Sequence, residues 1–373
     1  MKVIVYAICK NEEKFVDRWV DSMREADEII VLDTGSADAS VELLTRRGVQ
    51  VYQRSIVPWR FDCARNASLA LVPEDADLCV CTDLDEVFHP GWRAAAERAW
   101  HGGVNQLRYR YTWNFAPDGS EGSVFYIEKI HARHGFRWKG AVHEVLVCDK
   151  PVQALAAGIQ LDHHADDQKS RSSYLPLLEL AVAEEPENDR NMHYLGREYL
   201  FRGRWDDAIR TLKRHLALPS AAWRDERCAS MRYLARCYAE KGDADAAEAW
   251  LLRAAAEAPY LREPWLELAE ALQRRGDWHG CTAAAVRALA IRERPQTYIS
   301  EAWAWGSLGD DLLSLGLYYT GAYEEALEAV ERAIALAPED ARLRENRRRI
   351  LDRLRAENDR LSKTACAAPA SAL

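Results

Sequence analysis

The sequence predicts two domains: an α/β domain with a Rossmann-like mixed sheet over residues 1–165, and an all-α solenoid of helical repeats over residues 174–361. In the first 150 residues, short apolar runs alternate with amphipathic stretches, which is typical of βαβ units. From about residue 174 the composition shifts to Ala, Leu, Glu and Arg at helical spacing. The chain has 373 residues and 48% hydrophobic residues, which suffices for two cored domains.

The α/β domain is expected to begin with a parallel arrangement and to end with an antiparallel one. We expect parallel strands at residues 3–8, 28–32, 49–52 and 78–82, with helices at 16–23, 39–46 and 62–71. A helix at 92–100 follows, and then two strands at 106–115 and 124–131, which flank the turn at 116–119. The antiparallel pair would complete a mixed sheet.

A motif with a glycine at the helix-to-helix turn recurs in the second domain. The glycines are Gly203, Gly242, Gly276 and Gly321, which lie 39, 34 and 45 residues apart. These intervals are close to the period of about 34 residues of tetratricopeptide helix pairs. Stacking of such pairs produces a concave surface, here with an irregular insert at residues 294–313. A charged capping helix at 340–361 and a disordered tail at 362–373 are expected to follow.

Charge and hydropathy exclude some classes of partner. The net charge is −9 and the sequence pI is about 5.7, without the basic block that tracks nucleic-acid phosphates. No apolar run approaches the ~18 residues of a membrane span, and the first apolar run is too short for a signal peptide. We therefore expect a soluble, cytoplasmic protein that does not bind nucleic acid. The sequence leaves the oligomeric state open, and an oligomer is compatible with it.

The most informative motif is Asp83-Leu84-Asp85, which follows the apolar run at residues 78–82. In extended backbone, residues two apart point to the same side, so both carboxylates are expected to project from the carboxyl end of the strand. Ligands bind at that end of open α/β sheets. Two carboxylates there suit Mg²⁺ or Mn²⁺ together with a substrate diphosphate, although a solvated acidic turn would give the same short motif.

Four polar motifs at successive strand ends together resemble family 2 glycosyltransferases of the GT-A fold, in the branch where a tetratricopeptide domain follows. The resemblance covers residues 1–360. The motifs are Ile8-Cys9-Lys10-Asn11-Glu12-Glu13, Val31-Leu32-Asp33-Thr34-Gly35-Ser36-Ala37-Asp38, Phe61-Asp62-Cys63-Ala64-Arg65-Asn66 and Thr82-Asp83-Leu84-Asp85-Glu86.

The resemblance implies roles for these residues in binding a nucleotide sugar. Base and ribose would be lined by Ala7, Cys9, Asn11, Glu12 and Asp33, although Asp33 could instead form an Asx turn with Gly35. Arg65 and Asn66 would approach the diphosphate, with a surface ion pair as the alternative for Arg65. Asp83, Leu84 and Asp85 would hold the metal and the diphosphate.

A downstream segment, residues 136–144, resembles the part that closes the family's catalytic domain. There His143 would contact the metal or the diphosphate, and Trp138 would either line the sugar pocket or be a core residue. His163 and His164 are interpreted as a domain junction, with a metal-like cluster as the alternative and His163 possible at the donor pocket.

An inverting transfer needs a base that removes the acceptor proton. The resemblance places an Asp, in a Glu-Asp pair, some fifteen residues before the closing His, but this chain has Ile127-Glu128-Lys129 there. The candidates for the base are therefore Glu128 and its rival Glu144.

The resemblance thus predicts a metal-dependent inverting glycosyltransferase that uses a nucleotide sugar, with a UDP-sugar favoured. A peptide or protein acceptor at the repeats is slightly preferred over a saccharide. Two alternatives stay open. One is a nucleotide-binding interaction scaffold with an impaired transferase domain. The weaker one is a nucleotidyltransferase, whose usual glycine-rich loop is missing after the first strand.

Overall fold

The computed structural model describes residues 1–166 and 174–366. These residues form two compact units. The first comprises Met1–Leu195 with Gln296–Tyr298, and the second comprises Gly196–Pro295 with the described residues from Ile299 onward. The first unit thus includes α5 (Tyr174–Glu184) and the start of α6 (Asp189–Phe201).

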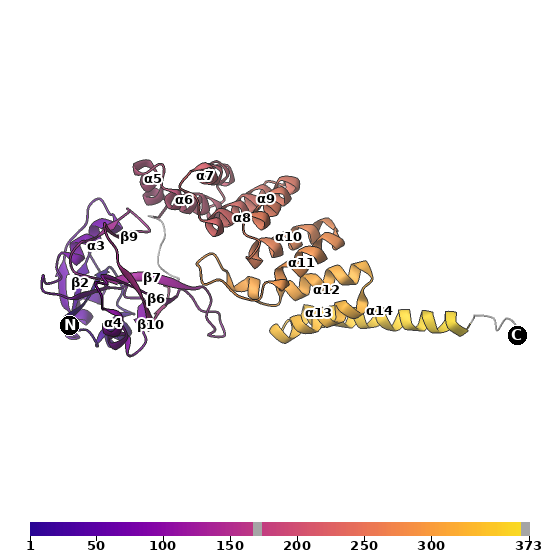
Figure 1. Ribbon diagram of the computed structural model, residues 1–373, viewed down its shortest axis with the longest axis horizontal. Helices are drawn as coiled ribbons and strands as arrows, with labels where there is room; N and C mark the ends of the chain where they lie inside the picture. The colour runs from indigo at the N-terminus through magenta and orange to yellow at the C-terminus, as the bar shows by residue number, and fades with distance from the viewer. Residues whose placement is uncertain (167–173, 367–373) are drawn as a thin grey trace. The chain divides into compact units, whose positions relative to one another are not determined.

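Within the described residues, the first unit contains a mixed sheet of eight strands in the order β3-β2-β1-β4-β7-β6-β10-β5 (Figure 1). The strands β1 to β4 are mutually parallel, as the βαβ pattern predicts, whereas β7 runs antiparallel to β4. A separate antiparallel pair is formed by β8 and β9. The strand bounds are Val3–Cys9 (β1), Glu28–Asp33 (β2), Gln50–Gln53 (β3), Leu78–Cys81 (β4), Glu86–Phe88 (β5), Gln106–Thr112 (β6), Val124–His131 (β7), Phe136–Lys139 (β8), Val145–Cys148 (β9) and Gln153–His163 (β10).

Four helices of this unit lie between or after the strands of the sheet, and α1 buries an apolar face. They are α1 (Val16–Met23), α2 (Ser40–Arg46), α3 (Phe61–Leu69) and α4 (Trp92–Ala99). In α1 the buried residues are Val16, Trp19, Val20 and Met23, which recur at the three- and four-residue spacing of one helix face. The indole N–H of Trp19 donates to the hydroxyl of Thr82 at 3.1 Å, so α1 is fixed against the chain that leaves β4.

Paired helices follow, as the glycine motif predicts. The remaining helices are α7 (Trp205–Ala217), α8 (Arg224–Glu240), α9 (Ala244–Glu257), α10 (Arg262–Arg275), α11 (Trp278–Ala290), η1 (Ala302–Trp305), α12 (Leu308–Thr320), α13 (Tyr323–Leu336) and α14 (Ala341–Cys366). Gly276 and Gly321 cap α10 and α12 with φ values of 76° and 87°, where a side chain would be strained. The predicted irregular insert is shorter than expected, because α12 already begins at Leu308.

The last helix is longer than the sequence predicts. It ends at Cys366 and not at residue 361, so the expected tail begins later. Residues 367–373 of that tail lie outside the described residues. None of the described helices combines the length and the apolar composition that a membrane crossing requires.

A buried hydrogen-bond chain links β1, β7 and β8. His131 is fully buried, and its Nδ1 lies 2.8 Å from the carbonyl oxygen of Ala132. This nitrogen must donate, so Nε2 accepts the hydroxyl of Tyr6 at 2.8 Å. The indole N–H of Trp138 donates to the same hydroxyl oxygen at 2.9 Å. The chain holds the imidazole neutral, and burial lowers the pKa of His131 to about 4.

We predict that the free energy of unfolding falls as the pH drops from about 6.5 to 4, because His131 binds a proton in the unfolded protein but stays neutral in the folded protein. Between pH 7 and 4.5 the free energy of unfolding should fall by about 2–3 kcal/mol on account of His131, at about 1.4 kcal/mol per pKa unit. Urea unfolding at both pH values checks this. The variant His131→Gln should lose that part of the pH dependence, whereas His134→Gln, at an exposed position, should keep it. Equal pH dependence in all three proteins would contradict the assignment.

Candidate active site

Polar residues after β1 and β2 are tied together at the carboxyl edge of the sheet. Asp33 ends β2 and is fully buried. Its carboxylate accepts the backbone N–H of Gly35 at 3.1 Å and the hydroxyl of Ser36 at 2.5 Å. Asn11, with a φ of 56°, donates its backbone N–H to Ser36 and accepts the N–H of Ala37. Asp33 therefore makes the Asx turn that was its alternative role; a ribose contact stays a prediction.

Four other predicted donor-site residues have buried side chains. They are Ala7, Cys9, Glu12 and Leu84, which are 0%, 2%, 6% and 2% exposed. Ala7 accepts the hydroxyl of Ser68 through its carbonyl oxygen at 2.8 Å, and Leu84 belongs to the hydrophobic core. Burial raises the pKa of the Cys9 thiol to about 12, so this thiol is neutral. A nucleotide contact from Ala7, Cys9 or Leu84 would therefore come from the backbone.

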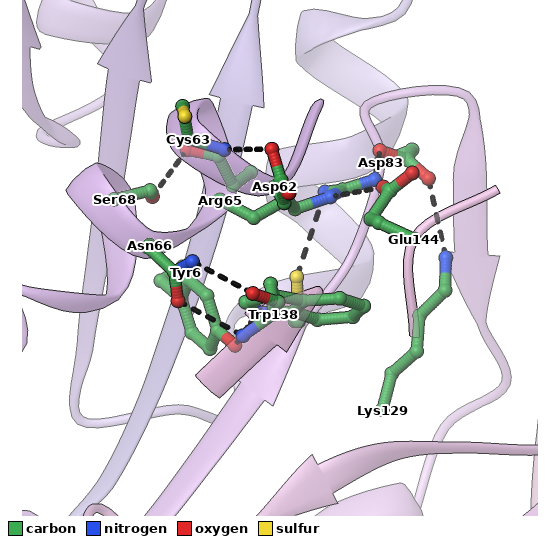
Figure 2. Close-up of polar contacts among 12 residues, drawn as sticks. Tyr6, Asp62, Cys63, Arg65, Asn66, Ser68, Asp83, Lys129, Trp138 and Glu144 are labelled. Carbon is green, nitrogen blue, oxygen red and sulfur yellow. Dashed lines mark hydrogen bonds and ion pairs between the residues drawn. The ribbon is translucent and has the colours of Figure 1, made fainter. Parts of the chain in front are cut away.

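Arg65 joins two carboxylates from distant parts of the chain (Figure 2). It lies in α3 and is 4% exposed. Its Nη2 donates to Asp83 Oδ1 at 2.6 Å, and its Nε donates to Glu144 Oε1 at 2.9 Å. Arg65 thus forms the ion pair that was its alternative role, but the guanidinium is buried and not at the surface; a contact with the diphosphate stays a prediction.

Lys129 holds the other oxygen of Asp83. Its Nζ donates to Asp83 Oδ2 at 3.2 Å and to Glu86 Oε1 at 2.8 Å. Glu86 is 1% exposed and also accepts the hydroxyl of Tyr111 at 2.9 Å and the backbone N–H of Asp83 at 2.9 Å. We call Arg65, Asp83, Glu86, Lys129 and Glu144 the charge network.

Opposite charges set the protonation of the charge network. Burial would raise the pKa of Asp83, but Arg65 and Lys129 outweigh burial and hold this pKa well below its usual range. Burial would lower the pKa of Lys129, but Asp83 and Glu86 raise it above its usual value. Burial raises the pKa of Glu86 in spite of Lys129. At neutral pH, Asp83 is therefore ionised and Lys129 is protonated.

Asp85 faces a different direction from Asp83. Strand β4 ends at Cys81, so the two aspartates lie in a turn, and the prediction that extended backbone carries them side by side is wrong. Asp85 Oδ2 lies 3.4 Å from Nε2 of His163, and the backbone N–H of His164 donates to the carbonyl oxygen of Asp85 at 2.8 Å. This backbone hydrogen bond holds Asp85 next to His163.

The orientation of His163 is determined by Trp113. Nδ1 of His163 lies 2.8 Å from the carbonyl oxygen of Trp113, and the two rings stack with centroids 4.3 Å apart. Nδ1 must therefore carry the hydrogen, and in the neutral ring Nε2 is an acceptor. Nε2 and the carboxylate of Asp85 are then two acceptors that face each other. Two acceptors at this distance are stable only with a proton or a cation between them.

Asn66 and Trp138 are joined by hydrogen bonds next to the charge network. The side chain of Asn66 donates to the carbonyl oxygen of Trp138 at 2.8 Å and accepts its backbone N–H at 2.9 Å (Figure 2). The indole of Trp138 is 5% exposed and belongs to a core cluster with Tyr6. The structure thus gives Trp138 the core position that was one of its two predicted roles, and it gives Asn66 a structural pairing.

The remaining predicted residues are spread around the charge network. Glu144 belongs to it, as described above. Glu128 neighbours Lys129 at an irregularity in the pairing of β7 with β6, and its Oε1 lies 3.3 Å from Nε of Arg108. His143 stacks on Tyr194 with centroids 3.9 Å apart, and the imidazole beside Asp85 is that of His163.

Sequence reasoning did not assign site roles to Lys129 and Glu86. Glu86 directly follows the Asp-x-Asp motif, and this proximity was the available signal. Lys129 reaches Asp83 because β7 pairs with β4, with Val80 opposite Ile130. That pairing joins segments some fifty residues apart, and no local pattern predicts it.

A mixed α/β sheet with an Asp-x-Asp turn at its carboxyl edge, followed by helix pairs, defines an α/β domain joined to a helical-repeat domain. Residues 4–138 match the family described as glycosyl transferase family 2, and residues 193–225 match a tetratricopeptide repeat. The chain therefore carries a family 2 glycosyltransferase domain followed by tetratricopeptide repeats, and its enzyme class is glycosyltransferase. The resemblance and the fold class inferred from the sequence are confirmed.

Comparison with solved structures returns helical-repeat proteins. The crystal structure of MamA protein is 17% identical over 45% of this chain and 83% of that chain, with a TM-score of 0.35. A thermophilic TPR protein of Thermus thermophilus is 21% identical over 48% of this chain and 88% of that chain, with a TM-score of 0.34. Among curated proteins, none matches the chain significantly.

We predict that Lys129→Gln destabilises the first unit, because it leaves the buried Glu86 carboxyl and Asp83 without this cation. The expected loss is about 2–4 kcal/mol in the free energy of unfolding, measured by urea denaturation at pH 7. The matched control is Lys139→Gln, because Lys139 is 56% exposed and its ion pair with Glu185 lies near the surface. That control should cost about 0–1 kcal/mol. Similar losses in the two variants would show that the charge network does not depend on Lys129.

Proposed function

We propose that the N-terminal domain transfers a sugar from a nucleotide sugar, with UDP as the leaving group, by a metal-dependent inverting reaction. The observation that carries the proposal is the turn after β4, which directs Asp83 to buried cations and Asp85 to His163. The edge of the sheet thereby offers positive groups and a separate pair of metal-ligand types within one turn of chain.

The pair of Asp85 and His163 fits a divalent cation. A histidine that ligates a metal usually donates its other ring N–H to a carbonyl oxygen or a carboxylate, and Nδ1 of His163 donates to Trp113 in this way. Carboxylate and imidazole are both accepted ligands of Mn²⁺, and diphosphate oxygens would complete the coordination. When bound, the cation would neutralise charge that develops on the leaving diphosphate.

Asp83 fits a direct metal ligand less well, since Arg65 and Lys129 hold its two oxygens. We assign to Asp83 the positioning of these two cations at the edge of the sheet. Arg65 offers a planar set of donors and Lys129 a compact charge, and both are suited to phosphate oxygens. His143 lies against Tyr194 and is therefore not our choice of metal ligand.

For the base that activates the acceptor, Glu144 is the better supported candidate. It shares Arg65 with Asp83, whereas Glu128 is paired with Arg108. In an inverting transfer the base takes the proton of the acceptor group, and a carboxylate side chain can fill that role.

A peptide or protein is the acceptor that we favour. Tetratricopeptide repeats support a role in protein interaction, and one such repeat matches residues 193–225. A saccharide acceptor is the alternative, and the nature of the acceptor atom is independent of the metal argument.

The proposal predicts that Asp85→Ala and His163→Ala slow the release of UDP from UDP-glucose or UDP-N-acetylglucosamine. With Mn²⁺ present, the expected decrease in kcat/KM is at least ~10²-fold, because each variant removes one proposed ligand. Binding of Mn²⁺ should weaken in parallel, as measured by electron paramagnetic resonance of the free ion. His134→Ala serves as the control, because its ring is 68% exposed and pairs with Glu74. Variants with wild-type turnover and wild-type Mn²⁺ affinity would contradict the proposed metal site.

One observation favours a second candidate function, a nucleotide-binding scaffold without transfer. Lys129 stands where the resemblance leads one to expect the acidic base, and it neutralises the nearby carboxylates. A thermal-shift titration with UDP and Mn²⁺ separates the two functions. Stabilisation by UDP without release of UDP from any sugar nucleotide in a panel would support the scaffold. Turnover that depends on Asp85 would exclude it.

A further inference from the structure

The last part of the connection between α11 and α12 is packed within the second unit. We call residues 299–305 the inner segment; it contains η1 (Ala302–Trp305). Ile299, Ser300 and Ala304 are 4%, 1% and 1% exposed. Ala304 shares a hydrophobic cluster with Leu266 of α10. A segment of ordinary surface loop would not be buried to this degree.

A buried arginine from another repeat anchors the inner segment. Arg232 lies in α8 and is 1% exposed. Its Nε and Nη2 donate to the carboxylate of Glu267 in α10, at 2.9 and 2.8 Å, and Nη2 also donates to Glu301 of the inner segment at 2.7 Å. One guanidinium thus bridges two helices and the segment. Charge-assisted bonds of this kind are among the stronger polar contacts.

Further contacts recognise the backbone and the aromatic rings of the inner segment. Glu263 of α10 accepts the backbone N–H of Glu301 at 2.7 Å. The guanidinium of Arg262 lies over the ring of Trp305, 3.9 Å from its centroid, in a cation–π contact. The indole N–H of Trp303 donates to Glu301 Oε2 at 3.0 Å, which orients the carboxylate toward Arg232. Side chains of α8 and α10 therefore bind a carboxylate, a backbone donor and an aromatic ring of the inner segment.

Two buried polar atoms at this contact are left unsatisfied. Within the described residues, Glu263 Oε2 and Trp305 Nε1 have no hydrogen-bond partner. A buried polar group without a partner destabilises the packing that contains it. The inner segment is therefore held by specific contacts without being fully satisfied, and this lowers the cost of releasing it from α8 and α10.

We propose that the face formed by α8 and α10 is a peptide-binding site, and that the inner segment of the same chain is its resident ligand. The external partner that fits is a peptide with the pattern of residues 301–305, namely a glutamate followed by aromatic residues at the second and fourth positions. The first helices of tetratricopeptide pairs line the concave surface of a solenoid, and α8 and α10 are the first helices of the second and third pairs.

The test is the binding of a fluorescein-labelled synthetic peptide of residues 298–306 to the full chain, measured by fluorescence anisotropy. A variant with a weakened resident ligand carries Glu301→Ala, Trp303→Ala and Trp305→Ala. We expect saturable binding to this variant and at least ~10-fold weaker binding to the wild-type chain, whose site is occupied. Circular dichroism establishes that the variant keeps its helical content.

The control is placed in the peptide, so that it cannot affect folding. A peptide with Gln at the position of Glu301 lacks the charged group that Arg232 binds, and it should bind at least ~10-fold more weakly. Arg232→Met in the triple variant should abolish binding. Absence of saturable binding to the folded variant, equal binding of the Gln peptide, or equal binding by the wild-type chain would each overturn the proposal. No sugar nucleotide takes part, so this outcome is independent of the transferase assignment.

Discussion

The carboxyl edge of the sheet depends on the pairing of buried charges. Arg65 and Lys129 each bridge two carboxylates, and these carboxylates come from the turn after β4, from β5 and from the segment after β8. A charge taken from water without a partner is expensive, so such groups are stable only as a set. The charge network therefore requires α3, β4, β5 and β7 to be in place at the same time.

The same constraint divides the Asp-x-Asp motif between two tasks. Asp83 is satisfied by protein cations, and its carboxylate has no oxygen left that is not already paired with Arg65 or Lys129. Asp85 faces Nε2 of His163, whose Nδ1 donates to Trp113. In the reaction that we propose, a divalent cation would enter on the side of Asp85, and the phosphate charge would gather near Arg65 and Lys129.

Most of the parallel half of the sheet could be predicted from the sequence, because β1, β2 and β4 contain apolar runs that are followed by polar residues. The strands β8, β9 and β10 could not, since β8 and β9 are only four residues long and β10 does not alternate regularly between buried and exposed residues. The site residues divide in the same way into those that the sequence could predict and those that it could not. Arg65, Asp83 and Asp85 follow or flank predicted elements, whereas Lys129 and His163 reach the site through pairings such as His163 with Glu86 across β10 and β5. Such register depends on contacts between distant residues, and local periodicity does not contain it.

The repeats show a comparable limit and a functional consequence. The third and fourth turn glycines lie 45 residues apart, against 34 for the second and third, and this difference predicts an insert without indicating its role. The structure places part of that insert against Arg232, Arg262 and Glu263 of α8 and α10. Under our two proposals, a peptide acceptor would have to displace the inner segment or bind elsewhere on the repeats. The length of one connection would then control which part of the solenoid is open to a partner, and an acceptor with an acidic residue ahead of aromatic rings would compete for the occupied part.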